Sequence, residues 1–378
     1  MTALFWVSVV AALYPMLLYP VLIRIVGAVR PQPVVRGDRQ PTVSILVPAF
    51  NEAAVIARTL AHLLAQDYPR RLTEIIVVSD ASSDGTDAIV EGHGADGVRL
   101  LRNESRAGKA EGLNRAVKAS MGEIIVFCDA NAWFAPSTVS RLVENFADAT
   151  VGYVTGALQF QSEHGVTSGG GGAYLRYENA LREAETLAGS IIGSNGGVDA
   201  IRRDLYLPIP QDQITDFVLP LSVLRAGLRV VFDPRALSSE AANEDMKPEF
   251  RMRVRVALRA LRGLWYVRDV MDPVHRPFVT FCILSHKVGR YLTFVALVGA
   301  FISNAALAPD SAVYAWLFVA QLALYALAAL ALTVRLPDWL QRLATIPAYY
   351  VASNAAFALA VFRFLRGQSM ATWQPRAG

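Results

Sequence analysis

Two oxygen-bearing side chains close an apolar run in the segment "FCDANAWF", residues 127–134. The run ends at Cys128, and Asp129 and Asn131 follow with one residue between them. If the segment is extended, both side chains point to the same side, because side chains alternate along an extended chain. Carboxylate and amide oxygens on one side suit Mg²⁺ or Mn²⁺, which keep positions open for phosphate oxygens. We therefore predict a divalent-metal site at Asp129 and Asn131, where an amide replaces a second acid.

Further acidic side chains follow other apolar runs of the chain. Glu52 closes the segment "PAFNE", and Asp80 lies near the start of "SDASSDGT". At any one such place Asp, Asn and Ser are explained by turns and helix caps. Three such segments, each directly after an apolar run, favour a shared site instead.

The elements that must position these side chains alternate between two sequence periods. Compact runs at 43–47, 75–78 and 124–128 predict buried strands, whereas helical spacing of apolar residues at 52–66 and 109–119 predicts helices. Alternating strands and helices indicate an α/β domain with a mostly parallel sheet. Because ligands bind beyond the carboxyl ends of such strands, we expect one crevice to collect the acidic residues named above.

Four uncharged apolar segments predict membrane-spanning helices, at residues 2–23, 291–309, 311–334 and 343–362. Each is close to the roughly 20 residues that a helix needs to cross a bilayer. Arg24, Arg30 and Arg36 follow the first segment, so the positive-inside tendency places the chain after it in the cytoplasm. We expect a multi-pass protein of the cell inner (plasma) membrane. Its expected parts are a transmembrane helix in 1–29, a cytoplasmic α/β domain at 40–240, amphipathic interfacial helices at 247–285, three transmembrane helices in 286–362 and a tail at 363–378.

Composition excludes several classes of protein. The apolar fraction of 53% and the charged fraction of 18% are unlike those of an ordinary soluble domain. The net charge is +4, but no basic-aromatic motif for nucleic acid is present, and the basic residues beside the spans favour an anionic lipid bilayer as partner. Cys128 and Cys282 are too far apart in sequence to suggest a disulfide or metal cluster. The uncharged spans argue against a transporter.

The motifs, in this order and spacing, resemble glycosyltransferase family 2, which has the GT-A fold. The resemblance covers nearly the whole chain, and its membrane end is similar to the hyaluronan-, chitin- and cellulose-synthase-like branch. The matching segments are "VSILVPAFNEAAVI" (43–56), "EIIVVSDASSDGTDAIV" (74–90), "RAGKAEGLNRAVKASMGEIIVFCDAN" (106–131), "GSNGGVDAIRRDLY" (193–206) and "ITDFVLPLSVLRAGLRVVFDPRA" (214–236).

The resemblance implies a nucleotide-binding role for five residues. Pro48, Glu52 and Asp80 would line the nucleoside pocket, with Asp80 near the uracil of a UDP donor. Lys109 would lie near the nucleotide sugar, and Asp129 would meet the diphosphate through the metal.

The resemblance also implies the residues of the transfer step. Asn131 would help Asp129 to hold Mg²⁺ or Mn²⁺, and Asn195 and Gly196 would flank the acceptor. Asp216 would be the base that deprotonates the acceptor hydroxyl. The alternative for Asp216 is a helix cap ahead of the apolar run at 217–224, and the two roles are compatible.

One motif of processive synthases, Gln-x-x-Arg-Trp, is missing. The segment "FRMRVRVALRALRGLW", residues 250–265, has five arginines and no acid. As an amphipathic helix it would lie on an anionic leaflet. In the other interpretation, Arg253 or Arg255 reaches the leaving diphosphate. The missing motif leaves processivity open.

The sequence therefore predicts a membrane-anchored, metal-dependent, inverting glycosyltransferase. The donor would be a nucleotide sugar, with UDP as the expected nucleotide, and the acceptor a growing polysaccharide or a lipid-linked glycan. Single transfer to polyprenyl phosphate and a catalytically silent nucleotide-binding membrane subunit are the alternatives. A second copy of the chain or a secretion partner would be a further partner.

Overall fold

The computed structural model of the chain describes residues 1–378 except 163–164, 167–169, 242–245, 335 and 369–378. Internal contacts divide it into two compact units. The α/β unit comprises Ile23–Asn243 and Arg262–Val279, and the helical unit comprises Met1–Leu22, Glu244–Leu261 and Thr280–Met370. Most of the tail predicted at 363–378 lies outside the described residues.

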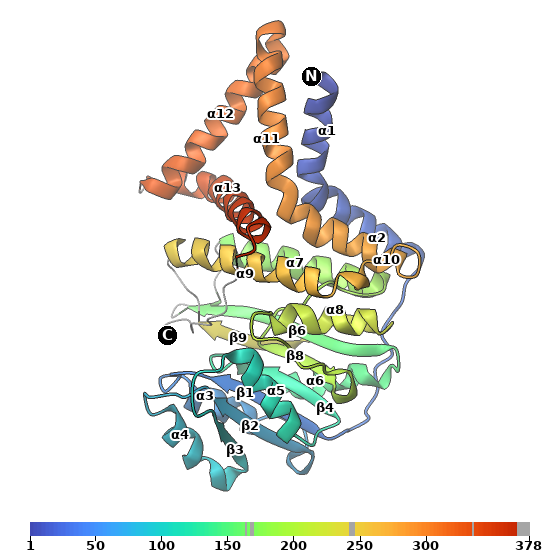
Figure 1. Cartoon of the computed structure of the whole chain (residues 1–378), viewed down its shortest axis with the longest axis vertical. Helices are drawn as coiled ribbons and strands as arrows, with labels where there is room; N and C mark the ends of the chain where they lie inside the picture. Colours follow the sequence, from blue (N-terminus) through green and yellow to red (C-terminus); the bar gives the residue numbers. More distant parts are fainter. Residues whose placement is uncertain (163–164, 167–169, 242–245, 335, 369–378) are drawn as a thin grey trace. The chain divides into compact units, whose positions relative to one another are not determined.

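A single sheet forms the centre of the α/β unit (Figure 1). Its strands are β1 (Val43–Ala49), β2 (Thr73–Ser79), β3 (Val98–Arg102), β4 (Ile124–Cys128), β5 (Trp133–Phe134), β6 (Val151–Ser162), β7 (Gly165–Val166), β8 (Val198–Arg202) and β9 (Arg229–Ala241). Their order is β3-β2-β1-β4-β8-β6-β9-β5, with β7 beside β6. The neighbours β3, β2, β1 and β4 are parallel, as are β6 and β9, whereas β8 runs antiparallel between β4 and β6. The predicted mostly parallel sheet is confirmed.

Helices cover both faces of this sheet, as the alternation of strand side chains requires. They are α3 (Ile56–Leu64), α4 (Thr86–Gly92), α5 (Lys109–Ala119), α6 (Thr138–Glu144), α7 (Gly170–Ala188) and α8 (Thr215–Arg225). On one face Ile45 of β1 shares a buried cluster with Leu60 of α3 and Leu142 of α6. On the other face α5 packs so closely on β2 that a β-carbon at Gly112 would lie 3.2 Å from Val78. The helix predicted at 109–119 has these bounds in the structure.

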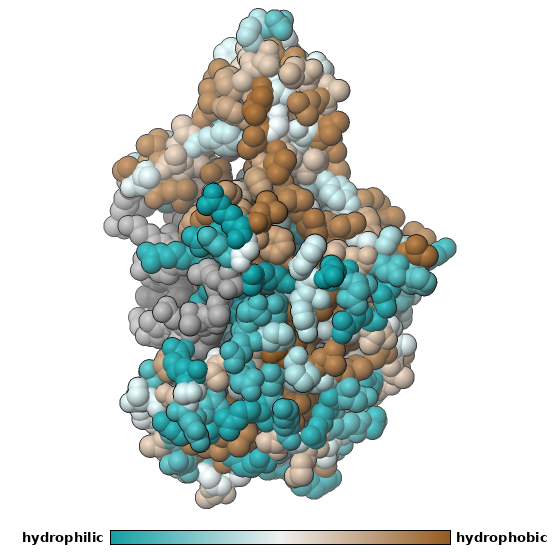
Figure 2. All heavy atoms as spheres, viewed as in Figure 1, coloured by the Kyte–Doolittle hydropathy of each residue, from teal (hydrophilic) through white to brown (hydrophobic). Residues whose placement is uncertain are grey.

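The helical unit contains long apolar helices. Its elements, some of which continue into the α/β unit, are α1 (Thr2–Leu13), a π-helical turn (Tyr14–Leu18), α2 (Tyr19–Val29), α9 (Met246–Tyr266), α10 (Pro277–Cys282), a second π-helical turn (Ile283–Val288), α11 (Gly289–Leu307), α12 (Ala312–Thr333) and α13 (Asp338–Leu365). Among the residues that the structure describes, four stretches are long and apolar enough to cross a membrane: Thr2–Val29, Pro277–Asp310, Ala312–Thr333 and Leu343–Leu365. Hydrophobic atoms dominate the visible surface of α11 and α12, whereas the visible surface of the α/β unit is largely hydrophilic (Figure 2).

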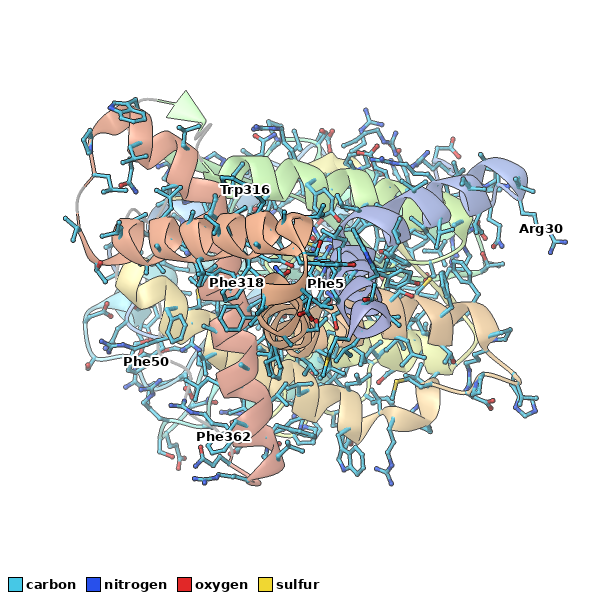
Figure 3. All side chains as sticks on the ribbon, turned by 90° about the horizontal axis from the view of Figure 1, so that it is seen from above. Phe5, Arg30, Phe50, Trp316, Phe318 and Phe362 are labelled. Atoms are coloured by element: carbon cyan, nitrogen blue, oxygen red, sulfur yellow. The ribbon has the colours of Figure 1, made fainter. Side chains whose placement is uncertain are left out.

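Aromatic side chains hold the apolar helices of this unit together. Phe5 of α1 packs on Tyr314 of α12 with 5.5 Å between ring centroids, and Phe318 of α12 lies 5.4 Å from Phe301 of α11 (Figure 3). The first π-helical turn contains Pro15, which cannot donate a backbone hydrogen bond, so the wider turn accommodates it without a break in the helix.

Candidate functional site

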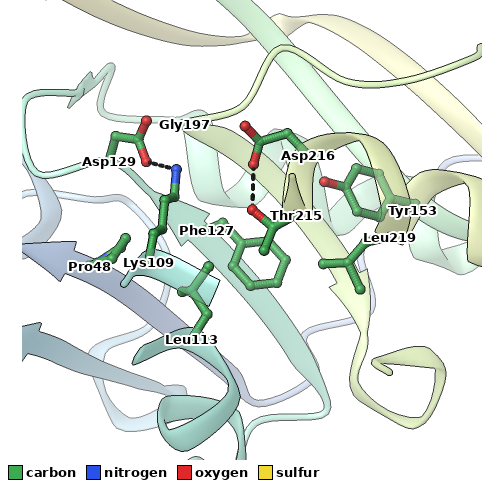
Figure 4. A pocket seen from close by; sticks show the side chains of 10 residues that line it. All are labelled: Pro48, Lys109, Leu113, Phe127, Asp129, Tyr153, Gly197, Thr215, Asp216 and Leu219. Atoms are coloured by element: carbon green, nitrogen blue, oxygen red, sulfur yellow. Dashed lines mark hydrogen bonds and ion pairs between the residues drawn. The ribbon is translucent and has the colours of Figure 1, made fainter. Parts of the chain in front are cut away.

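A pocket lies at the carboxyl ends of the central strands of the α/β unit (Figure 4). It gathers residues from the ends of β1 and β4, from the starts of α5 and α8, from β6 and from the loop before β8. The lining residues are Pro48, Lys109, Leu113, Phe127, Asp129, Tyr153, Gly197, Thr215, Asp216 and Leu219. Four predicted site residues, Pro48, Lys109, Asp129 and Asp216, thus meet in one pocket.

A charged pair forms one side of the pocket. Lys109 is the first residue of α5, and its Nζ lies 2.6 Å from Oδ1 of Asp129. Burial by itself lowers the pKa of Lys109, but the carboxylates of Asp129 and Asp216 outweigh burial and raise this pKa above its usual value. The lysine therefore carries a positive charge toward any anionic group bound beside Asp129.

The turn after β4 differs from the predicted extended segment. The backbone N–H of Ala132 donates to the carbonyl of Asp129 at 2.9 Å, which closes a turn over residues 129–132. The expected alternation of Asp129 and Asn131 on an extended chain is therefore wrong, because the chain turns here to enter β5. Asn131 is half-buried in the turn and is not among the residues that line the pocket.

Asp216 lies across the pocket from the charged pair (Figure 4). The hydroxyl of Thr215 donates to its Oδ1 at 2.9 Å. Helix α8 starts at Thr215, its N-cap residue is Ile214, and no side chain caps it. The cap role considered for Asp216 is therefore wrong. Asp216 lies in the first turn, where a negative charge is favoured by the helix dipole.

The loop before β8 approaches Asp216 through glycine. A β-carbon at Gly196 would lie only 2.6 Å from Oδ2 of Asp216, and Gly196 has φ +70°. Its neighbour Asn195 is held by the sheet, since its side-chain amide donates to the carbonyl of Gly156 at 2.7 Å and its backbone N–H to Thr155 Oγ1 at 3.2 Å. Thus Gly196 lies beside the predicted base, while the amide nitrogen of Asn195 anchors the loop.

Asp199 is a buried acid that is not among the predicted site residues. Its side chain is 1% exposed on β8, and its Oδ2 accepts a hydrogen bond from Ser194 Oγ at 2.8 Å. Burial and the nearby carboxylate of Asp216 raise the pKa of Asp199 to about 7. The signal in the sequence is one acid inside an otherwise apolar strand, "VDAI".

Two of the predicted nucleoside-pocket residues lie beside the pocket lining. Burial and the carboxylates of Asp129 and Asp84 raise the pKa of Glu52, which follows β1, to about 7. The carboxylate of Asp80 accepts hydrogen bonds from the side chain of Asn103 at 2.8 Å and from two backbone N–H groups, those of Ala107 at 2.7 Å and Gly108 at 3.0 Å. Asp80 thereby fixes the loop that leads into Lys109.

The two candidate arginines belong to the helical unit. The guanidinium of Arg253 donates to Ser353 Oγ of α13 at 2.7 Å and stacks 4.0 Å from the ring centroid of Tyr349. Arg255 is half-buried on α9. The apolar side of α9 is packed within this unit, where Val254 and Leu258 share a buried cluster with alanines of α13. The diphosphate role of Arg253 and Arg255 stays a prediction, as does the contact of α9 with an anionic leaflet.

Comparison with known proteins identifies relatives of this chain. Residues 44–204 match the family model "Glycosyl transferase family 2". An N-acetylglucosaminyltransferase of Mesorhizobium japonicum is 24% identical over 69% of this chain and 66% of its own length. A poly-beta-1,6-N-acetyl-D-glucosamine synthase of Staphylococcus aureus is 25% identical over 60% of this chain and 56% of its own length. The matches thus span just under two thirds of the first curated relative and less of the second.

A solved structure resembles the chain over nearly its whole length. It is a mannosyltransferase from Pyrobaculum calidifontis in complex with GDP-Man and Mn²⁺, with a TM-score of 0.73 and 26% identity. The similarity covers 97% of this chain and 99% of that one. The expected GT-A fold and the resemblance to family 2 are both confirmed.

Proposed function

We propose, from the premise that residues 44–204 belong to glycosyl transferase family 2, that the chain is a membrane-anchored, metal-dependent, inverting glycosyltransferase. It moves a sugar from a nucleotide donor to a growing polysaccharide or a lipid-linked glycan, with the α/β unit in the cytoplasm. The observation that carries the proposal is one pocket with the Lys109–Asp129 pair on one side and Asp216 on the other.

The residues of the pocket have separate tasks in this reaction. The ammonium of Lys109 attracts the negatively charged diphosphate of the donor and opposes the charge that develops on it as the sugar leaves. Asp216 accepts the proton of the acceptor hydroxyl as that oxygen attacks the anomeric carbon. Attack from the face opposite the leaving diphosphate, in one displacement, inverts the anomeric centre.

A divalent cation fits the residues beside Asp129. Oδ1 of Asp129 faces Lys109, and its Oδ2 would lie 3.6 Å from a β-carbon at Gly197, so the missing side chain leaves a small cradle at that oxygen. Among the described residues no group of three or more His, Cys, Asp or Glu could hold a metal alone. Asp129, with help from Asn131, would hold Mg²⁺ or Mn²⁺ together with donor diphosphate oxygens. When bound, the cation acts as a Lewis acid toward the leaving diphosphate.

The relatives support particular donor and acceptor classes for this proposal. An N-acetylhexosamine carried by UDP is the first candidate donor, since the curated relatives are named for N-acetylglucosamine. Mannose from GDP-Man is the second, favoured by the similarity along the whole chain to a mannosyltransferase. A polysaccharide synthase among the relatives supports a growing glycan as acceptor.

The test is a panel of radiolabelled UDP- and GDP-sugars added to membranes that contain the protein, with Mn²⁺ or Mg²⁺. We expect transfer of one sugar into a lipid-soluble or polymeric product, and much slower transfer with the Asp216→Asn protein. The number of sugar units in the product distinguishes polymer synthesis from single transfer to polyprenyl phosphate. Nucleotide binding without transfer of any sugar would favour the silent subunit and overturn the proposal.

A further inference from the structure

A second acidic residue lies beside the turn that carries Asp129. Strand β5 follows this turn directly and pairs antiparallel with β9, so that Trp133 faces Ser239. The next residue of β9 is Glu240, whose side chain is 5% exposed. The pairing of β5 with β9 therefore brings an acid from the far end of the domain sequence to the predicted metal motif.

Glu240 and Asp129 face the same small space. A β-carbon at Gly197 would lie 3.3 Å from Oε1 of Glu240 and 3.6 Å from Oδ2 of Asp129. Gly197 has φ +72°, a backbone conformation that L side chains rarely adopt, so this residue leaves the space between the two oxygens open. The other oxygen of Asp129 is engaged by Lys109 at 2.6 Å. Asp129 thus directs one oxygen to the lysine and the other to the cradle shared with Glu240.

The charges of Asp129 and Glu240 favour a divalent cation between their side chains. Two carboxylates that face one small space repel each other, and a divalent cation between them would reverse this cost. The motif after β4 offers Asp129 and the neutral Asn131, so it supplies one negative charge. Since the affinity of such a site rises with the number of charged oxygen ligands, a second acid from another strand restores the missing charge.

We propose that Glu240 is the second acidic ligand of the divalent cation. Glu240 and Asp129 would both bind the cation in the space beside Gly197. The inference rests on the proposed function and deepens it. Strand β9 would supply the negative charge that Asn131 lacks, and donor diphosphate oxygens and water would be the remaining ligands.

The test measures metal binding rather than turnover. Mn²⁺ is titrated into the purified full chain with saturating UDP, and separately with GDP, and free Mn²⁺ is followed by electron paramagnetic resonance. We expect Glu240→Gln to weaken Mn²⁺ binding by about tenfold or more, since loss even of residues that only support a ligand costs ~10–100-fold. The matched control is Glu183→Gln, on an exposed residue of α7, which should bind Mn²⁺ as the unmodified chain does.

A rescue variant makes the test specific to charge. On the Glu240→Gln background, Asn131→Asp returns a second carboxylate to the motif and should recover most of the lost affinity. Equal Mn²⁺ affinity of Glu240→Gln and the unmodified chain would overturn the inference, as would a double variant no better than Glu240→Gln. An unmodified chain that binds no Mn²⁺ with either nucleotide would instead overturn the metal step of the proposed function.

Folding is controlled by the circular dichroism spectrum and melting temperature of each variant in EDTA, where no metal is bound. If Glu240→Gln does not fold as the unmodified chain does, Glu240→Asp decides the question, because it keeps the charge but shortens the reach of the carboxylate. Weaker Mn²⁺ binding by Glu240→Asp supports the ligand role, and unchanged binding overturns it.

Discussion

At the scale of single residues, Asp216 carries the proposed proton transfer. In the unmodified chain the Thr215 hydroxyl lies 2.9 Å from Oδ1 of Asp216. Asp216→Asn keeps the shape of the side chain and an acceptor for this hydroxyl, but it cannot take a proton. General-base assistance contributes ~10²–10⁴-fold, so we expect the turnover number to fall by at least about 10²-fold. Nucleotide affinity, measured by calorimetry, should be retained. A variant that loses nucleotide affinity and keeps its turnover number would show that Asp216 is not the base.

The metal motif gives a second prediction at this scale. Asp129→Ala should abolish transfer, because the diphosphate loses its charge partner and Lys109 loses the carboxylate at 2.6 Å. Asn131→Ala should weaken transfer less, and Asn131→Asp should be tolerated because the added acid strengthens a hard-ion site. The measurement is the initial rate across a Mn²⁺ titration. Transfer that resists EDTA, together with an active Asp129→Ala protein, would exclude the metal role.

The raised pKa of Asp199 predicts that the stability of the folded chain depends on pH. Burial and Asp216 raise its pKa from 3.8 to about 7 in the folded chain, so folding favours the protonated acid. That stabilisation is complete below about pH 4 and is lost as pH rises through 7. Asp199→Asn mimics the neutral acid and keeps an acceptor for Ser194, so we expect its melting temperature to exceed that of the unmodified chain at pH 8 by a few degrees. The difference should shrink toward pH 5, and the exposed variant Asp204→Asn should show no such trend.

At the scale of elements, local sequence predicted the parallel part of the sheet well. The strands at β1, β2 and β4 and the helix α5 follow from apolar runs and helical spacing, which depend on neighbours in sequence. The turn at 129–132 was not predicted; it leads directly into β5, whose partner β9 is distant in sequence. For the same reason Asp199 and Glu240 were missed: only the assembled sheet brings them to Asp216 and Asp129.

The loop before β8 can approach Asp216 closely because residue 196 is a glycine. Gly196→Ala strains a backbone at φ +70° and places a β-carbon 2.6 Å from Oδ2 of Asp216, so the carboxylate must move. A displacement of about 1 Å at a reacting group can cost ~10²-fold in rate, which is the loss that we expect in turnover number.

Gly227→Ala is the matched control for Gly196→Ala. Gly227 has φ +81°, and apart from its chain neighbours no atom lies within 4 Å of its added β-carbon, so the control carries the same backbone strain without the contact. Both variants should lose about 1–2 kcal/mol of stability, measured by denaturant unfolding of the purified chain. Equal activity of the two variants would contradict the role assigned to the loop.

At the scale of the whole molecule, the four candidate spans raise the question of orientation. Arg24, Arg30 and Arg36 after the first apolar segment predict that the α/β unit is cytoplasmic. On this prediction the second span would cross outward to the turn at 308–311, which has no basic residue, and α12 would return to the arginine-containing segment 335–342.

The last span brings two topological signals into conflict. A fourth crossing by α13 would put the arginines after it outside, against the positive-inside tendency, whereas a re-entrant segment would keep them inside. The segment Leu343–Leu365 is 23 residues long, enough to cross, and its buried small residues, such as Ala356 and Ala360, pack on α9 as interior helices do. Length and packing therefore favour a full crossing, with orientation fixed by the earlier spans.

We predict four crossings with both ends of this sequence outside. A reporter fused after Gly378 should show periplasmic-type phosphatase activity, and a fluorescent protein that folds only in the cytoplasm should stay dark there. Fusions after Ser311 and Pro337 are the controls. The first lies on the predicted outer side and should show phosphatase activity, and the second lies on the predicted inner side and should fluoresce. Fluorescence after Gly378, with the two control fusions as expected, would establish that α13 re-enters the membrane instead of crossing it.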